Sequence, residues 1–137
     1  MNVVESQWWI VDLPPEWEAE QDGETIIISD ETGVGEIAIT TMEKQDGAVD
    51  DADLREFTQE LEVEFGQGEA VSVTECEGYY FSYTEEGDAI REWCLRCDNL
   101  LIFITYCCDQ ANAGMDDSSV DEILDTLFIK VEEERSE

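Results

Sequence analysis

Residues 100–106 constrain the fold of this chain more than any other part of its sequence. Their alternate positions carry Leu, Ile, Ile and Tyr on one side and Leu, Phe and Thr on the other. Successive side chains of a β-strand point to opposite faces, and a strand that is apolar on both faces is covered on both. We therefore expect a central strand, with one layer of structure above it and another below it.

Short turns join this segment to its neighbours in the sequence. Asp98-Asn99 and residues 85–88 are turn signals, and links of this length join antiparallel strands. Four strands are therefore expected in succession, at residues 70–75, 79–84, 89–97 and 100–107.

A second group of strands is expected near the N-terminus. Three segments have strand composition and are expected to form a meander, at residues 7–13, 25–29 and 36–41. Pro14-Pro15 ends the first of them, because proline cannot donate to a strand ladder. Residues 16–18 are expected to be a turn or a short extended piece.

The first of two predicted helices covers residues 50–65. Its apolar residues recur at helical spacing and form one stripe, namely Leu54, Phe57, Leu61 and Phe65. Asp50 or Asp51 is the expected N-cap, and Gly66 is placed to end the helix.

The second helix is expected after Ser119, which with Glu122 matches a capping box. Its core stripe would be Val120, Ile123, Leu124 and Leu127, and residues 128–131 would leave it as a short extended piece. The whole pattern predicts an α+β fold, an antiparallel sheet of six to seven strands covered by helices in an α/β/α sandwich. Residues 1–131 would form one domain, and residues 132–137 a frayed acidic tail.

The net charge of −31, from 37 acidic and 6 basic residues, limits the partners of this chain. Because 42% of the residues are hydrophobic, we expect a folded domain under an acidic surface rather than a disordered acidic tail. Direct binding to nucleic acid or to an anionic membrane is excluded, since both depend on basic residues that neutralise phosphate. The chain has neither a membrane-spanning run nor a signal-like N-terminus, so cytoplasmic residence is expected.

Three physical accounts of the charge compete. An acidic shell can keep a protein hydrated in a saline habitat. It can also attract a basic protein partner, as when an immunity or antitoxin protein caps a basic nuclease. Rows of carboxylates can also mimic the phosphates of DNA. Ionic strength separates these accounts, because salt stabilises the first kind of protein and weakens the complexes of the others.

Five cysteines allow two readings. Cys94 and Cys97 have CxxC spacing, and a hairpin at Asp98-Asn99 could bring them to Cys107 and Cys108 as a four-thiolate zinc site. The alternative is that all the cysteines are reduced thiols packed as small hydrophobic residues.

Three stretches carry a family resemblance: residues 9–17 (WIVDLPPEW), the strand start Gly78-Tyr79-Tyr80-Phe81, and residues 120–127 (VDEILDTL). With the order of the predicted elements, they resemble the Mog/PsbP-like fold, in particular the small bacterial DcrB-like members, over residues 6–130. Members of this group include a photosystem II extrinsic subunit, a Ran-binding factor and chaperones of secreted effectors. The resemblance implies binding rather than catalysis, because these proteins share no catalytic residues. The absence of a signal or lipoprotein segment argues against an envelope role.

The candidate binding residues are acidic, aromatic or basic. The acidic side of the first helix is the leading contact surface, through Asp53, Glu56, Glu60 and Glu64. Trp8 is a contact anchor if it points outward, and a core residue if a helix covers it. Arg91 and Arg96 would lie on opposite faces of their strand. Each would pair with an acid such as Glu75 or Glu85, or anchor an anionic ligand.

No catalytic motif or cofactor-binding motif is present. The chain lacks histidine, and it has no phosphate loop, nucleophile elbow or complete EF-hand. We therefore expect a non-catalytic binding module without a cofactor, whose partner is a protein and could be basic. One alternative is an immunity-type or DNA-mimic inhibitor of a basic nucleic-acid-binding protein. Another is a halophile-adapted domain with a structural zinc–thiolate site.

Overall fold

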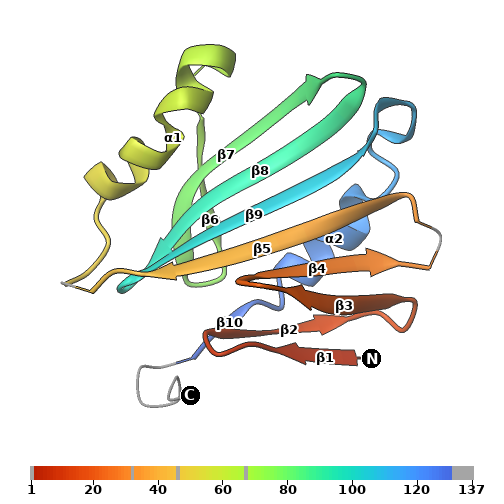
Figure 1. The fold of residues 1–137 in the computed structure, drawn as a ribbon, viewed down its shortest axis with the longest axis horizontal. Helices are drawn as coiled ribbons and strands as arrows, with labels where there is room; N and C mark the ends of the chain where they lie inside the picture. The colour runs from red at the N-terminus through yellow and green to blue at the C-terminus, as the bar shows by residue number, and fades with distance from the viewer. Residues whose placement is uncertain (1, 32, 46, 67, 131–137) are drawn as a thin grey trace.

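The computed structural model describes residues 2–31, 33–45, 47–66 and 68–130 (Figure 1). The predicted tail, residues 132–137, lies outside the described residues. Within them, no helix has the length and the apolar character that crossing a lipid bilayer requires.

A seven-stranded antiparallel sheet forms the body of the molecule, in the order β3-β4-β5-β9-β8-β7-β6. Its strands are β3 (Trp17–Asp22), β4 (Thr25–Asp30), β5 (Gly35–Glu43), β6 (Glu69–Val73), β7 (Cys76–Glu85), β8 (Asp88–Cys97) and β9 (Leu100–Asp109). The strand predicted to be central is β9, and it does lie in the middle of the sheet, between β5 and β8. The predicted α+β class and strand number are confirmed.

A second sheet has three strands in the order β1-β2-β10, namely β1 (Asn2–Glu5), β2 (Trp9–Leu13) and β10 (Phe128–Ile129). The predicted meander is therefore wrong at its first strand, because β2 pairs with β1 and β10 rather than with β4. Its place beside β4 is taken by β3, whose start was expected to be a turn or a short extended piece (residues 16–18). This strand is hard to recognise from sequence, because it lies at the sheet edge and buries only Trp17.

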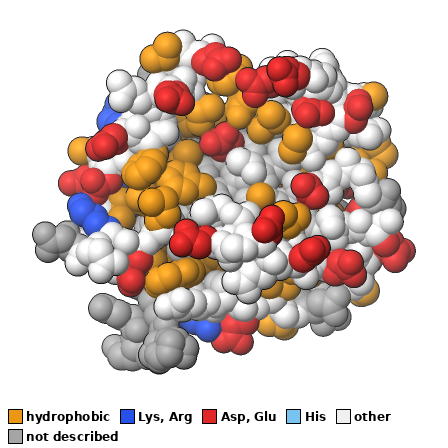
Figure 2. All heavy atoms as spheres, viewed as in Figure 1, with side chains coloured by type: hydrophobic (Ala, Val, Ile, Leu, Met, Phe, Trp, Pro, Cys, Tyr) orange, Lys and Arg blue, Asp and Glu red, His pale blue; other side chains and the backbone are white. Residues whose placement is uncertain are grey.

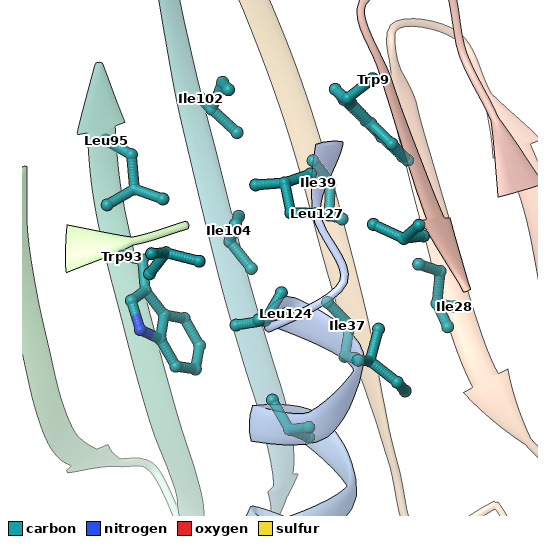
Figure 3. Packing of buried hydrophobic residues seen from close by; sticks show 14 of the residues in the cluster. Trp9, Ile28, Ile37, Ile39, Trp93, Leu95, Ile102, Ile104, Leu124 and Leu127 are labelled. Atoms are coloured by element: carbon teal, nitrogen blue, oxygen red, sulfur yellow. The ribbon is translucent and has the colours of Figure 1, made fainter. Parts of the chain in front are cut away.

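The main core lies between one face of the large sheet and a layer made of the small sheet and helix α2 (Asp117–Leu124) (Figure 3). Buried side chains of both layers meet there, among them Trp9, Ile28, Ile37, Ile39, Trp93, Leu95, Ile102, Ile104, Leu124 and Leu127. The cover on this face is thus a helix and a sheet together, rather than helices alone.

Helix α1 (Asp51–Phe65) covers part of the opposite face. Leu54 packs there against Cys94 and Leu101 in a second, smaller core. On β9, Leu101 is buried but Phe103 is only half-buried. The expectation that β9 is covered on both sides is therefore confirmed for the face in the main core. It is wrong for most of the face on the side of α1, because the helix lies against β7 and β8.

The ends of α1 follow the prediction. Asp50 is the N-cap and accepts a hydrogen bond from the Asp53 backbone N–H at 2.9 Å, while Asp53 accepts one from the Asp50 N–H at 3.1 Å. Gly66 follows the last turn with φ of 92°, a left-handed conformation that favours glycine. This reciprocal cap satisfies backbone donors that the first turn of a helix leaves unpaired.

The start of α2 differs from the prediction. The helix begins at Asp117 with Asp116 as its N-cap, so Ser119 lies inside it and no capping box forms. The Asp116 carboxylate is buried and accepts a hydrogen bond of 2.6 Å from the hydroxyl of Tyr106 on β9. The helix is therefore positioned by this contact with the sheet, while Val120, Ile123 and Leu124 enter the core as expected.

The acidic side chains lie outside this core, and we expect salt to stabilise the fold. Each described Lys or Arg already pairs with a carboxylate, so within the described ranges the acidic residues greatly outnumber their possible basic partners. Self-repulsion falls as the screening length shortens from about 10 Å at 0.1 M salt to about 3 Å at 1 M. The thermal midpoint should rise across this range of NaCl. A midpoint that stayed constant in circular dichroism melts would contradict this account of the charge.

Candidate functional site

The exposed side of α1 is the surface that best fits a binding role. A shallow hollow of about 890 Å³ runs along it, lined by Glu56, Phe57, Gln59, Glu60, Val63 and Glu64. We call these six residues the α1 face. Phe57 is 46% exposed and Val63 is 85% exposed, so the hollow presents apolar surface to solvent. Figure 2 shows hydrophobic side chains gathered on this side of the molecule, among scattered acidic ones.

The apolar surface continues from the helix onto the sheet. The rings of Phe57 and Phe103 on β9 lie 5.3 Å apart between centroids, in a tilted contact. Met42 on β5 is 42% exposed and pairs with Leu101, the buried neighbour of Phe103 on the same face of β9. The α1 face therefore borders a sheet surface whose apolar residues are only partly covered.

Phe57 is exposed because the buried stripe of α1 differs from the predicted one. Leu54 and Thr58 are the buried residues of the helix, and Leu61 is half-buried. Thr58 is satisfied by a bond of 3.4 Å from its hydroxyl to the carbonyl of Arg55. The helix is therefore turned about its axis relative to the prediction. As a result, Phe57 lies at the edge of the contact with the sheet rather than in the buried stripe.

Both ends of α1 are fixed to the structure around them. At the N-terminal end, Asp51 accepts a hydrogen bond of 2.5 Å from the hydroxyl of Tyr79, which holds the pKa of Asp51 below its usual value. At the C-terminal end, Phe65 stacks on Tyr83 with ring centroids 4.0 Å apart. The α1 face is thus presented by a helix anchored at two points.

The predicted acidic contact residues divide into two groups. Glu56, Glu60 and Glu64 are exposed and belong to the α1 face. Asp53 pairs with Lys44 at 2.8 Å, and this hydrogen bond holds the pKa of Asp53 below its usual value. Since its carboxylate also caps the helix, Asp53 stabilises α1 rather than presenting a contact surface.

Arg91 fastens α2 to the large sheet. Its guanidinium pairs with Asp121 at 2.8 Å and with Asp117 at 3.5 Å, both on α2. It also donates to the hydroxyl of Tyr80 at 2.8 Å and lies 4.7 Å from the centroid of Trp93. These partners engage the guanidinium fully, so the structure gives Arg91 a packing role.

Arg96 lies on the opposite face and fixes the segment that leads into α1. It donates to the carbonyl of Val49 at 2.9 Å and pairs with Glu77 at 2.7 Å on the neighbouring strand. Among the described residues, neither arginine forms an ion pair with Glu75 or Glu85, the partners expected from sequence. An ion pair was expected for each arginine. That the acidic partners of Arg91 would come from α2 was not expected.

The adjacent residues Trp8 and Trp9 have different environments. Trp9 enters the main core, where its indole N–H donates to the hydroxyl of Thr41 at 3.0 Å. Trp8 is half-buried and lines a separate cleft at the seam between the two sheets. Trp8 also packs partly against the main core, so the expectation that one of the pair faces away from that core is not met.

The four cysteines of the proposed zinc site do not come together. Cys94 lies under α1, while Cys97 points to the main-core face of the same strand. Cys107 and Cys108 pair with Ile90 and Ala89, near the far end of β8. Within the part of the chain that the structure describes, no group of three or more His, Cys, Asp or Glu side chains could hold a metal ion. Strand alternation separates Cys94 from Cys97, and the register of the β8–β9 hairpin places Cys107 and Cys108 at its other end.

Burial predicts unequal thiol reactivity. Desolvation raises the pKa of the Cys94 thiol to about 12 and also raises that of Cys107. Since only the thiolate reacts, iodoacetamide at about pH 8 should label the half-buried Cys97 and Cys107 well before Cys94. Peptide mass spectrometry reads this order, and unfolding in urea should remove it. Early labelling of Cys94 in the folded protein would contradict its position under α1.

Comparison with known proteins shows the fold and leaves the function open. No family model matches the chain, and no curated protein matches it. A crystal structure from Bacteroides thetaiotaomicron VPI-5482 superposes over 92% of this chain with a TM-score of 0.69 at 19% identity. This chain spans 46% of the length of that structure.

A second match is the solution structure of PsbP (CyanoP) from Synechocystis sp. PCC 6803. It has 11% identity and a TM-score of 0.45, and the match covers 90% of this chain and 88% of that one. Membership in the PsbP-like group, and among its DcrB-like members, stays a prediction.

Proposed function

We propose that this domain is a non-catalytic cytoplasmic module that binds a positively charged protein through the α1 face. The observation that carries the proposal is an exposed aromatic residue, Phe57, on an anchored helix that also presents three carboxylates. Protein interfaces commonly combine an apolar centre with a polar rim, and aromatic residues are enriched among their anchors. None of the five cysteines, all of which the structure describes, forms a disulfide bond, which fits a reducing compartment.

The two chemical features of the α1 face would contribute differently to binding. Burial of Phe57 by a partner would add affinity, because an aromatic side chain at the centre of an interface typically accounts for more than about 1 kcal/mol. The carboxylates of Glu56, Glu60 and Glu64 would mainly raise the association rate and exclude acidic partners. A basic nucleic-acid-binding protein is one partner with this chemistry. The proposal therefore includes the case in which this domain inhibits such a protein by binding it.

Affinity capture with matched variants tests the proposal. The domain is immobilised and exposed to lysate of the source organism at low and high salt, and bound proteins are identified by mass spectrometry. We expect a specific partner of high isoelectric point, retained about tenfold less by Phe57→Ala. Neutralising the three carboxylates of the α1 face (E56Q/E60Q/E64Q) should slow association at low salt.

The control removes the same charge from another part of the surface. Three exposed glutamates in or next to the edge strand β3 are replaced in one variant, E16Q/E18Q/E20Q. This variant should bind as the unmodified domain does. Equal weakening by the two triple variants would mean that net charge alone attracts the partner, and it would reject the α1 face as the docking surface.

A further inference from the structure

A cleft at the seam between the two sheets has a composition that suits a ligand. Its volume is about 600 Å³, and it lies between residues 5–9 and the neighbouring ends of β3, β4 and β5. Ligand sites for small molecules typically enclose about 300–1,000 Å³. Its lining includes Trp8, Trp9 and Ile26, with Glu5, Glu24 and Glu43 also contributing to the wall.

The aromatic wall of the cleft is held in place by hydrogen bonds. The Ser6 hydroxyl oxygen accepts from the backbone N–H groups of Trp8 and Trp9, both at 3.1 Å. The Trp9 indole is fixed by its bond to Thr41, which also lines the cleft. Ile26 packs partly against the core beside them. The cleft therefore has an ordered apolar wall before any ligand binds.

The charge of the lining selects for a cation. None of the described residues that line the cleft is Lys or Arg, and three of them are glutamates. The nearby Lys130 pairs with Glu5 at 2.5 Å, which leaves Glu24 and Glu43 to set the local charge. An anionic ligand would be repelled here, whereas a cation would gain from the carboxylates and from the face of Trp8.

The arrangement of the carboxylates favours an extended cation over a metal ion. A metal ion needs several ligands that converge on one point, and no such group exists among the described residues. The three glutamates come instead from three segments of the chain: β1, the β3–β4 turn and the end of β5. Separated carboxylates around an apolar wall match a ligand whose charges are separated by a hydrocarbon chain.

We propose that this cleft binds an aliphatic polyamine. The alkane stem lies against Trp8 and Ile26, and the ammonium groups pair with Glu24 and Glu43. This site is independent of the α1 face, which is formed by other residues on the opposite side of the large sheet.

Titration calorimetry with spermidine tests the site in about 0.15 M NaCl, where diffuse surface attraction is screened beyond about 8 Å. The domain should bind one equivalent. Trp8→Ala and the double variant E24Q/E43Q should each weaken binding at least about tenfold, or about 1.4 kcal/mol. Trp8→Phe retains an aromatic face and should keep most of the affinity, which separates loss of the ring from loss of folding.

The charge-matched control is E18Q/E20Q, on the edge strand β3 and outside the cleft lining. It should bind spermidine as the unmodified domain does. The proposal is overturned if both double variants weaken binding equally, if several equivalents bind without saturation, or if no binding is seen. Tighter binding of a lysine tetrapeptide through the same residues would also overturn it, since the cleft would then belong to a protein segment.

Discussion

Replacing Gly78 by alanine is expected to destabilise the domain by about 3 kcal/mol or more, because overpacking against a fixed backbone is among the most costly substitutions. Gly78 lies on β7 and pairs with Leu95 on β8. A Cβ at this position would lie 1.9 Å from the carbonyl oxygen of Cys94 and 2.9 Å from the Cα of Leu95. The neighbouring strand cannot move away, since β8 is also paired along its length with β9.

Urea unfolding followed by tryptophan fluorescence measures this loss. The matched control is Ser82→Ala, which changes an exposed residue on the same face of the same strand. Exposed substitutions of this kind usually stay within about 0.5 kcal/mol. A Gly78→Ala variant as stable as this control would mean that β7 and β8 are not in the register described above.

Trp9→Ala is expected to cost about 3–5 kcal/mol, the range for truncating a buried aromatic residue. Trp9 is only 1% exposed and is one of the largest buried side chains in the chain. Its removal would open a void between the small and large sheets and leave the buried Thr41 hydroxyl without its donor. Single domains are stable by only about 5–15 kcal/mol, so the unfolded population should rise by orders of magnitude.

Its neighbour Trp8 provides the control for this prediction. Because Trp8 is half-buried and lines the open cleft, Trp8→Ala should cost only about 1 kcal/mol. Thermal and urea unfolding of the two variants can be compared directly. Equal losses, or a larger loss for Trp8→Ala, would contradict the assignment of Trp9 to the interface between the sheets.

The parts of the fold that sequence predicts well are those whose local pattern and tertiary environment agree. β9 is apolar on both sides and is central, and Asp50 and Gly66 bound α1 as their chemistry requires. The short strands β1 and β3 were missed because edge strands bury few residues and so have no strong alternation. The pairing of β2 with β10 joins segments from the two ends of the chain, and nothing local encodes such a contact.

The candidate site was predictable only in its charge. Glu56, Glu60 and Glu64 follow from helical spacing, whereas the exposure of Phe57 depends on Thr58 being buried in its place. Helical periodicity alone favours Phe over Thr for the core, so this exchange is visible only in the packed structure. The partners of Arg91 were likewise hidden, because they are on a helix far along the chain.

Site-directed photo-cross-linking tests the proposed docking surface most directly. A photo-reactive residue is placed at Val63, which is exposed on the α1 face, or at Glu20, which is exposed on the edge strand β3. After irradiation in lysate of the source organism at low salt, the domain carrying the probe at Val63 should be joined to a basic protein. That product should disappear at high salt. It should also disappear when the chain that carries the probe at Val63 has the substitution Phe57→Ala as well. Equal cross-linking from Glu20, or a product that forms from Glu20 alone, would contradict binding through the α1 face.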